Sequence, residues 1–158
     1  MSKRALVFGC TGQDGSYLAK SLLNKNYEVH GISRSKKPNK INHKKLDIQD
    51  QLDIHSINVF NITEIINLVN KLNPHEIYNL AGQSSVGLSF LKPYTTLKSI
   101  VDITRNILEA SRKLKYDGNL FFAGSGEIYG ETLNKATKDS ITVAVCNGAV
   151  YEPTPKIR

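Results

Sequence analysis

The sequence predicts an α/β domain built on a parallel β-sheet, and three observations lead to this prediction. Short apolar runs alternate with segments of helical periodicity, which is the pattern of parallel strands joined by right-handed helical crossovers. A glycine-rich turn connects the first apolar run to the first helical segment. The length of 158 residues suits a single domain.

The first half of the chain supplies three predicted strands. Residues 4–9 are a short apolar run that ends in glycine, typical of a buried parallel strand. A helix follows from Ser16, because apolar side chains then recur at helical spacing. Residues 28–33 and 54–58 are the second and third strands. The polar, lysine-rich residues 34–50 show no period, so we expect a loop.

The second half continues the alternation. Apolar side chains in residues 62–72 keep to positions i, i+3, i+4 and i+7, which predicts a helix that the following Asn-Pro pair ends. Residues 76–80 are the fourth strand. A long helix follows Pro93 and runs to Leu114, and residues 119–123 are the fifth strand. The expected architecture is a doubly wound parallel sheet.

The composition is that of a folded protein. The chain is 40% hydrophobic and 22% charged, a balance typical of globular rather than disordered proteins. No apolar run reaches the ~18 residues that span a bilayer, and the N-terminus has no signal-peptide pattern. Two cysteines are too few for a disulfide framework. We therefore expect a cytoplasmic protein without a membrane partner.

The formal net charge of +7 has three explanations: a nucleic-acid partner, a phosphate-rich small ligand, or a solvated basic surface. Lysines are concentrated between residues 36 and 45, and no aromatic residue lies between Arg34 and Lys45. Binding to single strands uses aromatic side chains on which bases stack. We therefore expect no nucleic-acid partner.

The first predicted strand leads into a loop with the spacing Gly-x-x-Gly-x-x-Gly. At this spacing the first glycine allows a tight turn, the second lets the backbone approach a pyrophosphate, and the third lets helix and strand pack closely. The N-terminus of the following helix favours an anion. The sequence therefore predicts a dinucleotide-binding loop that consists of Gly9, Thr11, Gly12, Gln13, Asp14 and Gly15.

The end of the second predicted strand indicates which dinucleotide binds. An acidic residue about 20 positions after the glycines would bind ribose hydroxyls and favour NAD. This chain has Ser33-Arg34-Ser35 there instead. A guanidinium can pair with a 2′-phosphate and stack on adenine, so Arg34 favours NADP over NAD. An exposed arginine in a basic surface is the alternative.

Three parts of the chain carry a resemblance to a known family. They are residues 11–18 with 27–32, residues 76–86, and residues 124–130, which read Gly-Ser-Gly-Glu-Ile-Tyr-Gly. In these parts the chain resembles the GDP-mannose 4,6-dehydratases, which belong to the extended short-chain dehydrogenase/reductase family. The resemblance implies a Rossmann NADP-binding domain over residues 1–140.

The resemblance also implies a reaction and homo-oligomers. GDP-mannose would be oxidised at C4, lose water across C5 and C6, and receive the hydride back at C6, giving GDP-4-keto-6-deoxymannose. Glu127 matches the family's glutamate that removes the C5 proton, which is acidic once C4 is a ketone. Ser125 matches the hydroxyl group that hydrogen-bonds the substrate O4.

Further contacts follow from the same matches. Asn58 and Val59 fall where the family usually has Asp-Leu in its adenine loop, and asparagine can still donate and accept at an adenine edge. The other implied contacts are those of Leu80, Ala81 and Gln83 with the cofactor and those of Ser84 and Ser85 with the substrate.

One part of the family pattern is absent. The family's base is a Tyr-x-x-x-Lys pair, whose spacing places both side chains on one helix face and lets the ammonium lower the phenol pKa. Tyr151 is the only tyrosine after residue 130, and four positions on stands Pro155. Residues 141–158 match nothing in the family, although residues 143–145 have strand character. We expect an N-terminal portion of the enzyme, inactive by itself.

Three alternatives remain open. A portion of another nucleotide-sugar epimerase or reductase is the first, and Glu127 argues against it because an epimerase usually needs no acid there. A non-catalytic NADP(H)-binding module would bind cofactor without chemistry. A nucleic-acid-binding protein would show salt-dependent binding to any duplex. The four histidines lack metal-ligand spacing, and we assign no redox role to Cys10.

Overall fold

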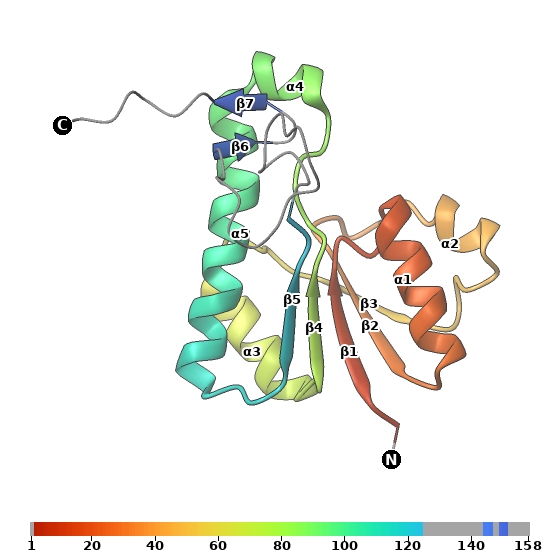
Figure 1. Ribbon diagram of the computed structural model, residues 1–158. Coiled ribbons are helices and arrows are strands. Elements are labelled where there is room, and N and C mark those ends of the chain that lie inside the picture. Colours follow the sequence, from red (N-terminus) through yellow and green to blue (C-terminus); the bar gives the residue numbers. More distant parts are fainter. Residues whose placement is uncertain (1, 125–143, 147–148, 152–158) are drawn as a thin grey trace, which may run out of the picture.

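The computed structural model describes residues 2–124, 144–146 and 149–151 (Figure 1). Its main feature is a five-stranded parallel sheet of order β3-β2-β1-β4-β5. From β1 the chain moves outward to β2 and β3, then crosses back so that β4 pairs with the other side of β1. This order confirms the predicted doubly wound, Rossmann-type fold. The strands are β1 (Arg4–Phe8), β2 (Glu28–Ser33), β3 (Asp53–Ser56), β4 (Glu76–Asn79) and β5 (Asn119–Phe122).

Helices cover both faces of the sheet (Figure 1). On one face lie α1 (Gln13–Asn24) and α2 (Ile41–Lys45). On the other lie α3 (Ile62–Leu72) and α5 (Pro93–Leu114), which pack against each other. The short α4 (Val86–Leu91) immediately precedes α5.

The central strand β1 joins the two halves of the core. Its side chains from Ala5 to Phe8 are completely buried. Leu6 and Phe8 pack into the core formed with α3 and α5, whereas Ala5 and Val7 pack into the core formed with α1. A strand covered on both faces needs a continuous apolar run, which explains the pattern of residues 4–9.

The two long helices on the second face begin and end where the sequence predicts. The Asn61 side chain accepts a hydrogen bond from the Thr63 N–H at 3.0 Å and so satisfies a donor at the start of α3. Asn73 ends that helix in the left-handed conformation, with φ of 42°. Pro93 starts α5 at a position where its missing N–H costs no helical hydrogen bond.

Several elements differ from the prediction. The sequence pattern does not predict α4, and α1 begins at Gln13 rather than at Ser16. A short helix, α2, lies within residues 34–50, which the sequence predicts to be a loop. The third strand ends at Ser56 rather than at Asn58. The Asn58 N–H donates to Glu64 Oε2 at 2.8 Å, and the Asn58 side-chain oxygen accepts from the Phe60 N–H at 3.1 Å. These bonds turn the chain into α3 before the sheet ladder can continue.

The C-terminal tail contains a small antiparallel pair. β6 (Ala144–Cys146) pairs with β7 (Ala149–Tyr151), with Val145 opposite Val150. β6 overlaps the predicted strand at residues 143–145. Within the described part of the chain, no helix has the length and apolar character needed to cross a membrane.

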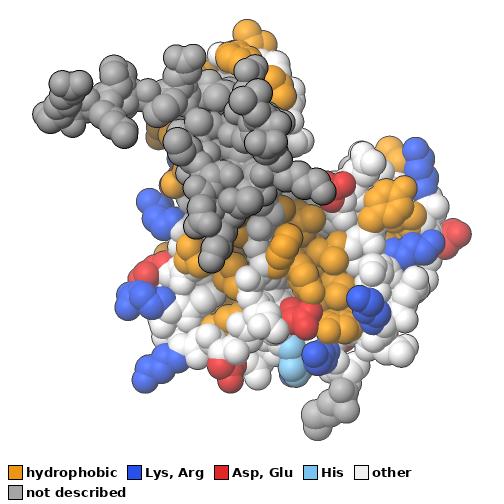
Figure 2. All heavy atoms as spheres, viewed as in Figure 1, with side chains coloured by type: hydrophobic (Ala, Val, Ile, Leu, Met, Phe, Trp, Pro, Cys, Tyr) orange, Lys and Arg blue, Asp and Glu red, His pale blue; other side chains and the backbone are white. Residues whose placement is uncertain are grey.

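β5 is an edge strand with exposed aromatic side chains. Among the described strands it pairs with β4 alone. Phe121 is 52% exposed and Phe122 is 44% exposed, and the Phe121 ring lies 6.0 Å from that of Tyr78 on β4. Figure 2 shows hydrophobic side chains gathered over the sheet on the viewed face. The helices therefore leave this edge of the sheet less covered than β1.

Candidate functional site

A cleft of about 530 Å³ lies at the carboxyl ends of β1, β2 and β4. The sheet order reverses between β1 and β4, so the loops that follow these strands run in opposite directions and leave a crevice between them. Six residues that the sequence assigns to cofactor binding line this cleft: Gly9, Thr11, Arg34, Val59, Ala81 and Gln83.

The glycine loop packs too closely for side chains at two positions. Gly9 has φ of +79°, and a Cβ there would lie 2.7 Å from the Leu80 carbonyl oxygen. A Cβ on Gly15 would overlap the Gly9 carbonyl oxygen. The Gly12 N–H donates to that same oxygen at 3.0 Å and closes the turn. The absence of side chains at Gly9 and Gly15 therefore lets the strand, the loop and the helix pack closely, and Gly9 lines the cleft.

The N-terminus of α1 follows directly. Gly12 is its N-cap residue and provides no side-chain cap, so N–H groups of the first turn are available to an external acceptor. Gln13 and Asp14 are exposed in this turn. They lie beside the cleft lining rather than within it, as does Gly12.

The segment around Arg34 is ordered by two consecutive serine turns. Ser33 Oγ accepts from the Ser35 N–H at 3.0 Å and donates to the Ser35 carbonyl at 3.1 Å. Ser35 Oγ makes the same pair of bonds with the backbone of Lys37, at 3.1 and 3.0 Å. Arg34 lies between them, exposed and on the cleft wall. The serines therefore shape the backbone that carries the guanidinium.

The loop after β3 presents an apolar wall. Val59 is almost completely buried and lines the cleft. Asn58 is exposed and does not line it, and its side-chain oxygen is already hydrogen-bonded to the Phe60 N–H. The acceptor atom expected at an adenine edge therefore serves a turn, and the amide nitrogen is the group left for a ligand.

Gln83 ties the loop after β4 to α5. Its amide Nε2 donates to Thr96 Oγ1 and to the Ser85 carbonyl, both at 3.0 Å, and its Oε1 accepts from the Ser85 N–H. Its backbone N–H donates to Ser99 Oγ at 3.1 Å. Gln83 therefore lines the cleft with a side chain that is held rigidly by protein partners.

The remaining sequence-predicted residues lie outside the cleft lining. Leu80 borders Gly9 through its backbone. Ser85 Oγ accepts from the Leu88 N–H at 3.3 Å and caps α4, and Ser84 is exposed next to it. Ser125 and Glu127 lie outside the described residues.

Sequence reasoning missed several cleft residues. Pro38 and Asn39 follow Arg34, while Thr95, Ser99 and Ile103 come from α5. The available signal was the spacing of Thr95 and Ser99, two small polar residues four positions apart on α5 and therefore on one face of that helix. Within the described residues, no group of three or more His, Cys, Asp or Glu side chains is placed to hold a metal ion.

Cys10 occupies the middle of the glycine loop, but its thiol is buried. Burial raises the pKa of Cys10 to about 11. The Sγ atom lies 3.6 Å from the Ile32 carbonyl oxygen and fills the space that a Cβ on Gly31 would need. A protonated, buried thiol is a poor nucleophile, so Cys10 serves packing.

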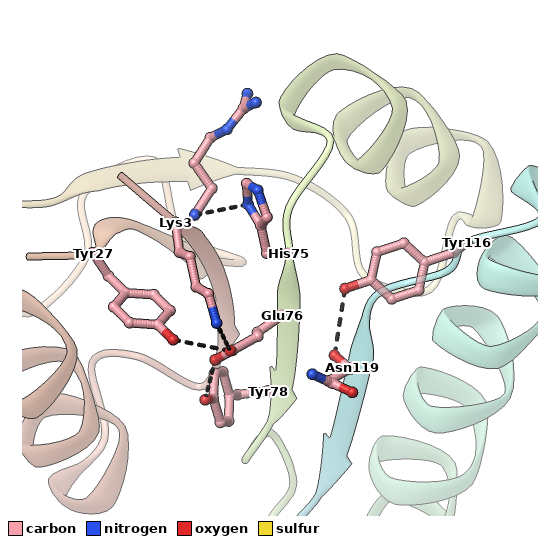
Figure 3. Close-up of polar contacts among 8 residues, drawn as sticks. Lys3, Tyr27, His75, Glu76, Tyr78, Tyr116 and Asn119 are labelled. Atoms are coloured by element: carbon pink, nitrogen blue, oxygen red, sulfur yellow. Dashed lines mark hydrogen bonds and ion pairs between the residues drawn. The ribbon is translucent and has the colours of Figure 1, made fainter. Parts of the chain in front are cut away.

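A second polar cluster lies at the opposite, amino-terminal end of the strands (Figure 3). Glu76 accepts hydrogen bonds from the hydroxyl groups of Tyr78, at 2.6 Å, and Tyr27, at 2.9 Å, and Lys3 Nζ lies 3.8 Å away. The Tyr78 hydrogen bond is the main reason why the pKa of Glu76 is lowered. These bonds join β4 to residues preceding β1 and β2, so the cluster stabilises the sheet far from the cleft.

Sequence comparison relates the chain to one protein family. The profile of a family described as GDP-mannose 4,6 dehydratase matches residues 6–144. A GDP-mannose 4,6-dehydratase of Yersinia enterocolitica is 39% identical over 136 residues, which cover 81% of this chain and 37% of that protein. The human GDP-mannose 4,6 dehydratase is 36% identical over 146 residues, with coverage of 86% and 39%. The chain therefore spans about two fifths of the length of these relatives.

Similar solved structures include UDP-glucose 4-epimerases. The enzyme of Stenotrophomonas maltophila, solved with bound NAD and formylated UDP-arabinopyranose, has a TM-score of 0.80 at 17% identity and covers 92% of this chain and 44% of that one. The enzyme of Brucella ovis, in complex with NAD, has a TM-score of 0.78 at 19% identity, with coverage of 91% and 42%. At this identity the likeness concerns the fold alone.

Proposed function

Because this chain belongs to the GDP-mannose 4,6-dehydratase family, we propose that it is the cofactor-binding portion of such an enzyme and binds NADP in the cleft. The observation that carries this proposal is that Gly9 and Thr11 of the glycine loop line the same cleft as Arg34. A phosphorylated dinucleotide needs both a site for its pyrophosphate and a cation for its 2′-phosphate.

The residues present fit this cofactor. Gly9 and Thr11 bring the glycine loop to the cleft wall, and the N-terminus of α1, which has no side-chain cap, follows directly, so that a pyrophosphate can approach both. Ile32 and Val59 supply apolar cleft walls that suit the adenine. Ala81 and Gln83, beyond β1 in the sheet, are the residues that would hold the nicotinamide half.

The proposed substrate is GDP-mannose. A bound nicotinamide would supply the hydride acceptor for oxidation and the donor for its return. For this chain's own residues we propose that Glu127 removes the C5 proton and that Ser125 hydrogen-bonds O4. Both roles rest on the Gly-Ser-Gly-Glu motif of residues 124–127 and on family membership.

Calorimetric titration of the 158-residue chain with NADP and with NAD tests the cofactor proposal. We expect saturable binding of both, tighter for NADP because the Arg34 guanidinium can pair with the 2′-phosphate. If neither NADP nor NAD bound, the assignment of the cleft as a dinucleotide site would be disproved. Tighter binding of NAD would leave the cleft assignment intact and disprove the role of Arg34.

Arg34→Ala provides the matched variant. We expect it to weaken NADP binding by about tenfold or more and to leave NAD binding little changed, because a charge-assisted hydrogen bond contributes roughly 1.5–3 kcal/mol. Lys37→Ala is the control, since it removes one positive charge from the same segment outside the cleft lining. Equal losses for the two variants would show that the general positive field, rather than Arg34, sets the preference.

A further inference from the structure

His43 on α2 is buried beneath the glycine loop. It has no exposed surface, and its Nε2 lies 2.8 Å from the Cys10 carbonyl oxygen. Its Nδ1 has no hydrogen-bond partner among the described residues and is shielded from solvent. An apolar side chain would fill this position without leaving a polar atom unpaired, so the contact with Cys10 is the feature that a histidine adds.

The arrangement determines which ring nitrogen carries the proton. A carbonyl oxygen only accepts hydrogen bonds, so Nε2 must be the donor. His43 therefore acts toward the Cys10 carbonyl as a donor through its Nε2–H group.

Side chains of α1 and α2 together hold successive carbonyl groups of the glycine loop. The Cys10 carbonyl accepts from His43 Nε2, and the Thr11 carbonyl accepts from Asn42 Nδ2 at 3.1 Å. Ser16 Oγ, which carries a single proton, lies 2.7 Å from the Gly12 carbonyl oxygen and 3.0 Å from the Cys10 carbonyl oxygen and shares that proton between them. His43 is buried and not part of the cleft lining, so the Cys10 oxygen is directed into the core.

This orientation affects the charge that the loop presents to a ligand. In a trans peptide the carbonyl and the following N–H point in opposite directions. With the Cys10 oxygen directed toward His43, the Thr11 N–H points away from the core, and Thr11 lines the cleft. A reversed peptide would instead present a negative carbonyl oxygen toward an incoming anion.

We propose that His43, assisted by Asn42, is a positioning residue that holds the glycine loop in the orientation that binds a dinucleotide pyrophosphate. This role deepens the proposed NADP binding and rests on it. His43 does not touch the ligand itself. It acts through the Cys10 carbonyl, and α2 is thereby part of the phosphate site.

Two ligands separate positioning from general support of the fold. NADP contains the pyrophosphate, whereas adenosine 2′-phosphate carries only the adenosine end and the group expected to meet Arg34. We expect His43→Phe, which removes the donor, to raise the Kd for NADP about tenfold and to leave the Kd for adenosine 2′-phosphate unchanged. We expect His43→Gln, which keeps an N–H donor, to bind NADP within about twofold of the unaltered chain.

Further variants control the interpretation. Asn42→Ala, at a half-buried position of α2, should show the same selective loss for NADP without opening the core. His75→Phe removes a side-chain hydrogen bond to the Arg4 N–H at the opposite end of the sheet and should change neither affinity. Arg34→Ala should weaken both ligands.

Three results would overturn the inference. One is an unchanged Kd for NADP in both His43→Phe and Asn42→Ala. Another is an equal loss for the two ligands, which would show that α2 only supports the fold. The last is a loss of NADP affinity in His43→Gln as large as that in His43→Phe. If the unaltered chain bound adenosine 2′-phosphate but not NADP, or bound neither, the proposed function would fail together with this inference.

Discussion

Individual residues of the glycine loop show how much depends on close packing. Gly9 adopts a backbone conformation with positive φ directly against the Leu80 carbonyl, and Cys10 fills the space beside Gly31. Neither Gly9 nor Gly31 tolerates a larger side chain. The nearest atoms are the Leu80 backbone at Gly9 and the buried Cys10 side chain at Gly31. At Gly9, replacement by alanine would also require a conformation that L-residues rarely adopt.

The burial of Cys10 leads to a prediction about its reactivity. Since its pKa is raised to about 11, the thiol stays protonated at pH 8 and reacts slowly with iodoacetamide. In a Cys146→Ser background Cys10 is the only cysteine. We expect almost no alkylation of the native protein at pH 8 and complete alkylation in concentrated urea, as measured by mass spectrometry. Rapid labelling of the native protein would contradict the burial of this side chain.

Several single-residue roles were not readable from the sequence. Motif spacing places Gly9, Thr11 and Arg34 in one site, and the structure brings them to the same cleft. The family resemblance assigns Asn58 and Gln83 to the cofactor, but both side chains make hydrogen bonds within the protein. Which polar atoms remain free depends on neighbours that are distant in sequence.

At the level of elements, sequence periodicity does not reveal the short helices α2 and α4. Of these two, α2 contacts the glycine loop. It has five residues, less than two helical turns, which is too short for a repeating apolar pattern to appear. Its single buried side chain is His43, and histidine is not a strong indicator of a core position. By contrast, α3 and α5 repeat their apolar pattern over several turns and were predicted with correct ends.

The hydrogen bonds at the start of β4 predict a pH-dependent stability. The lowered pKa of Glu76 means that its ionised form stabilises the fold above the unfolded-state pKa, near 4.5, and that this contribution is lost as the pH falls through the folded-state value. Tyr78→Phe removes its main hydrogen bond. We expect a loss of about 1–2 kcal/mol in the free energy of unfolding at pH 7.

Urea unfolding at several pH values measures this effect. The difference between the unaltered protein and Tyr78→Phe should be largest near pH 7 and should shrink as the pH falls below 4.5 and through the lowered folded-state pKa of Glu76, because the carboxylate is then lost. Tyr116→Phe is the control, because its hydroxyl group bonds the Asn119 carbonyl and not Glu76. A difference that stayed constant from pH 7 to pH 3 would contradict the assignment.

For the whole molecule, the sheet order decides where the site lies. Residues of the candidate site come from positions as far apart as Gly9 and Ile103. They meet because β1 and β4 are neighbours although β2 and β3 separate them in the chain. The loops that follow the three inner strands β1, β2 and β4 therefore meet at the carboxyl end of the sheet. The Glu76 cluster stabilises the opposite, amino-terminal end.

The 158-residue chain is expected to bind cofactor without turning over sugar nucleotide. The sequence contains no Tyr-x-x-x-Lys pair after residue 130, so no phenol with an adjacent ammonium is available to start the oxidation at C4. Incubation with NADP and GDP-mannose should give no 4-keto product detectable by NMR. NADP binding in the same sample would show that the protein is folded. Formation of the product would mean that another residue acts as the base.

The sequence by itself determined the fold class, the order of strands and long helices, the glycine loop and the position of Arg34. These features depend on local periodicity and on motif residues whose spacing is set by the geometry of a strand, a turn and a helix that follow one another in the chain. Only the tertiary structure decided that α2 supports the loop through His43 and that Asn58 and Gln83 bond within the protein. Hydrogen-bond partners and burial arise from contacts between distant segments, and no local pattern encodes them.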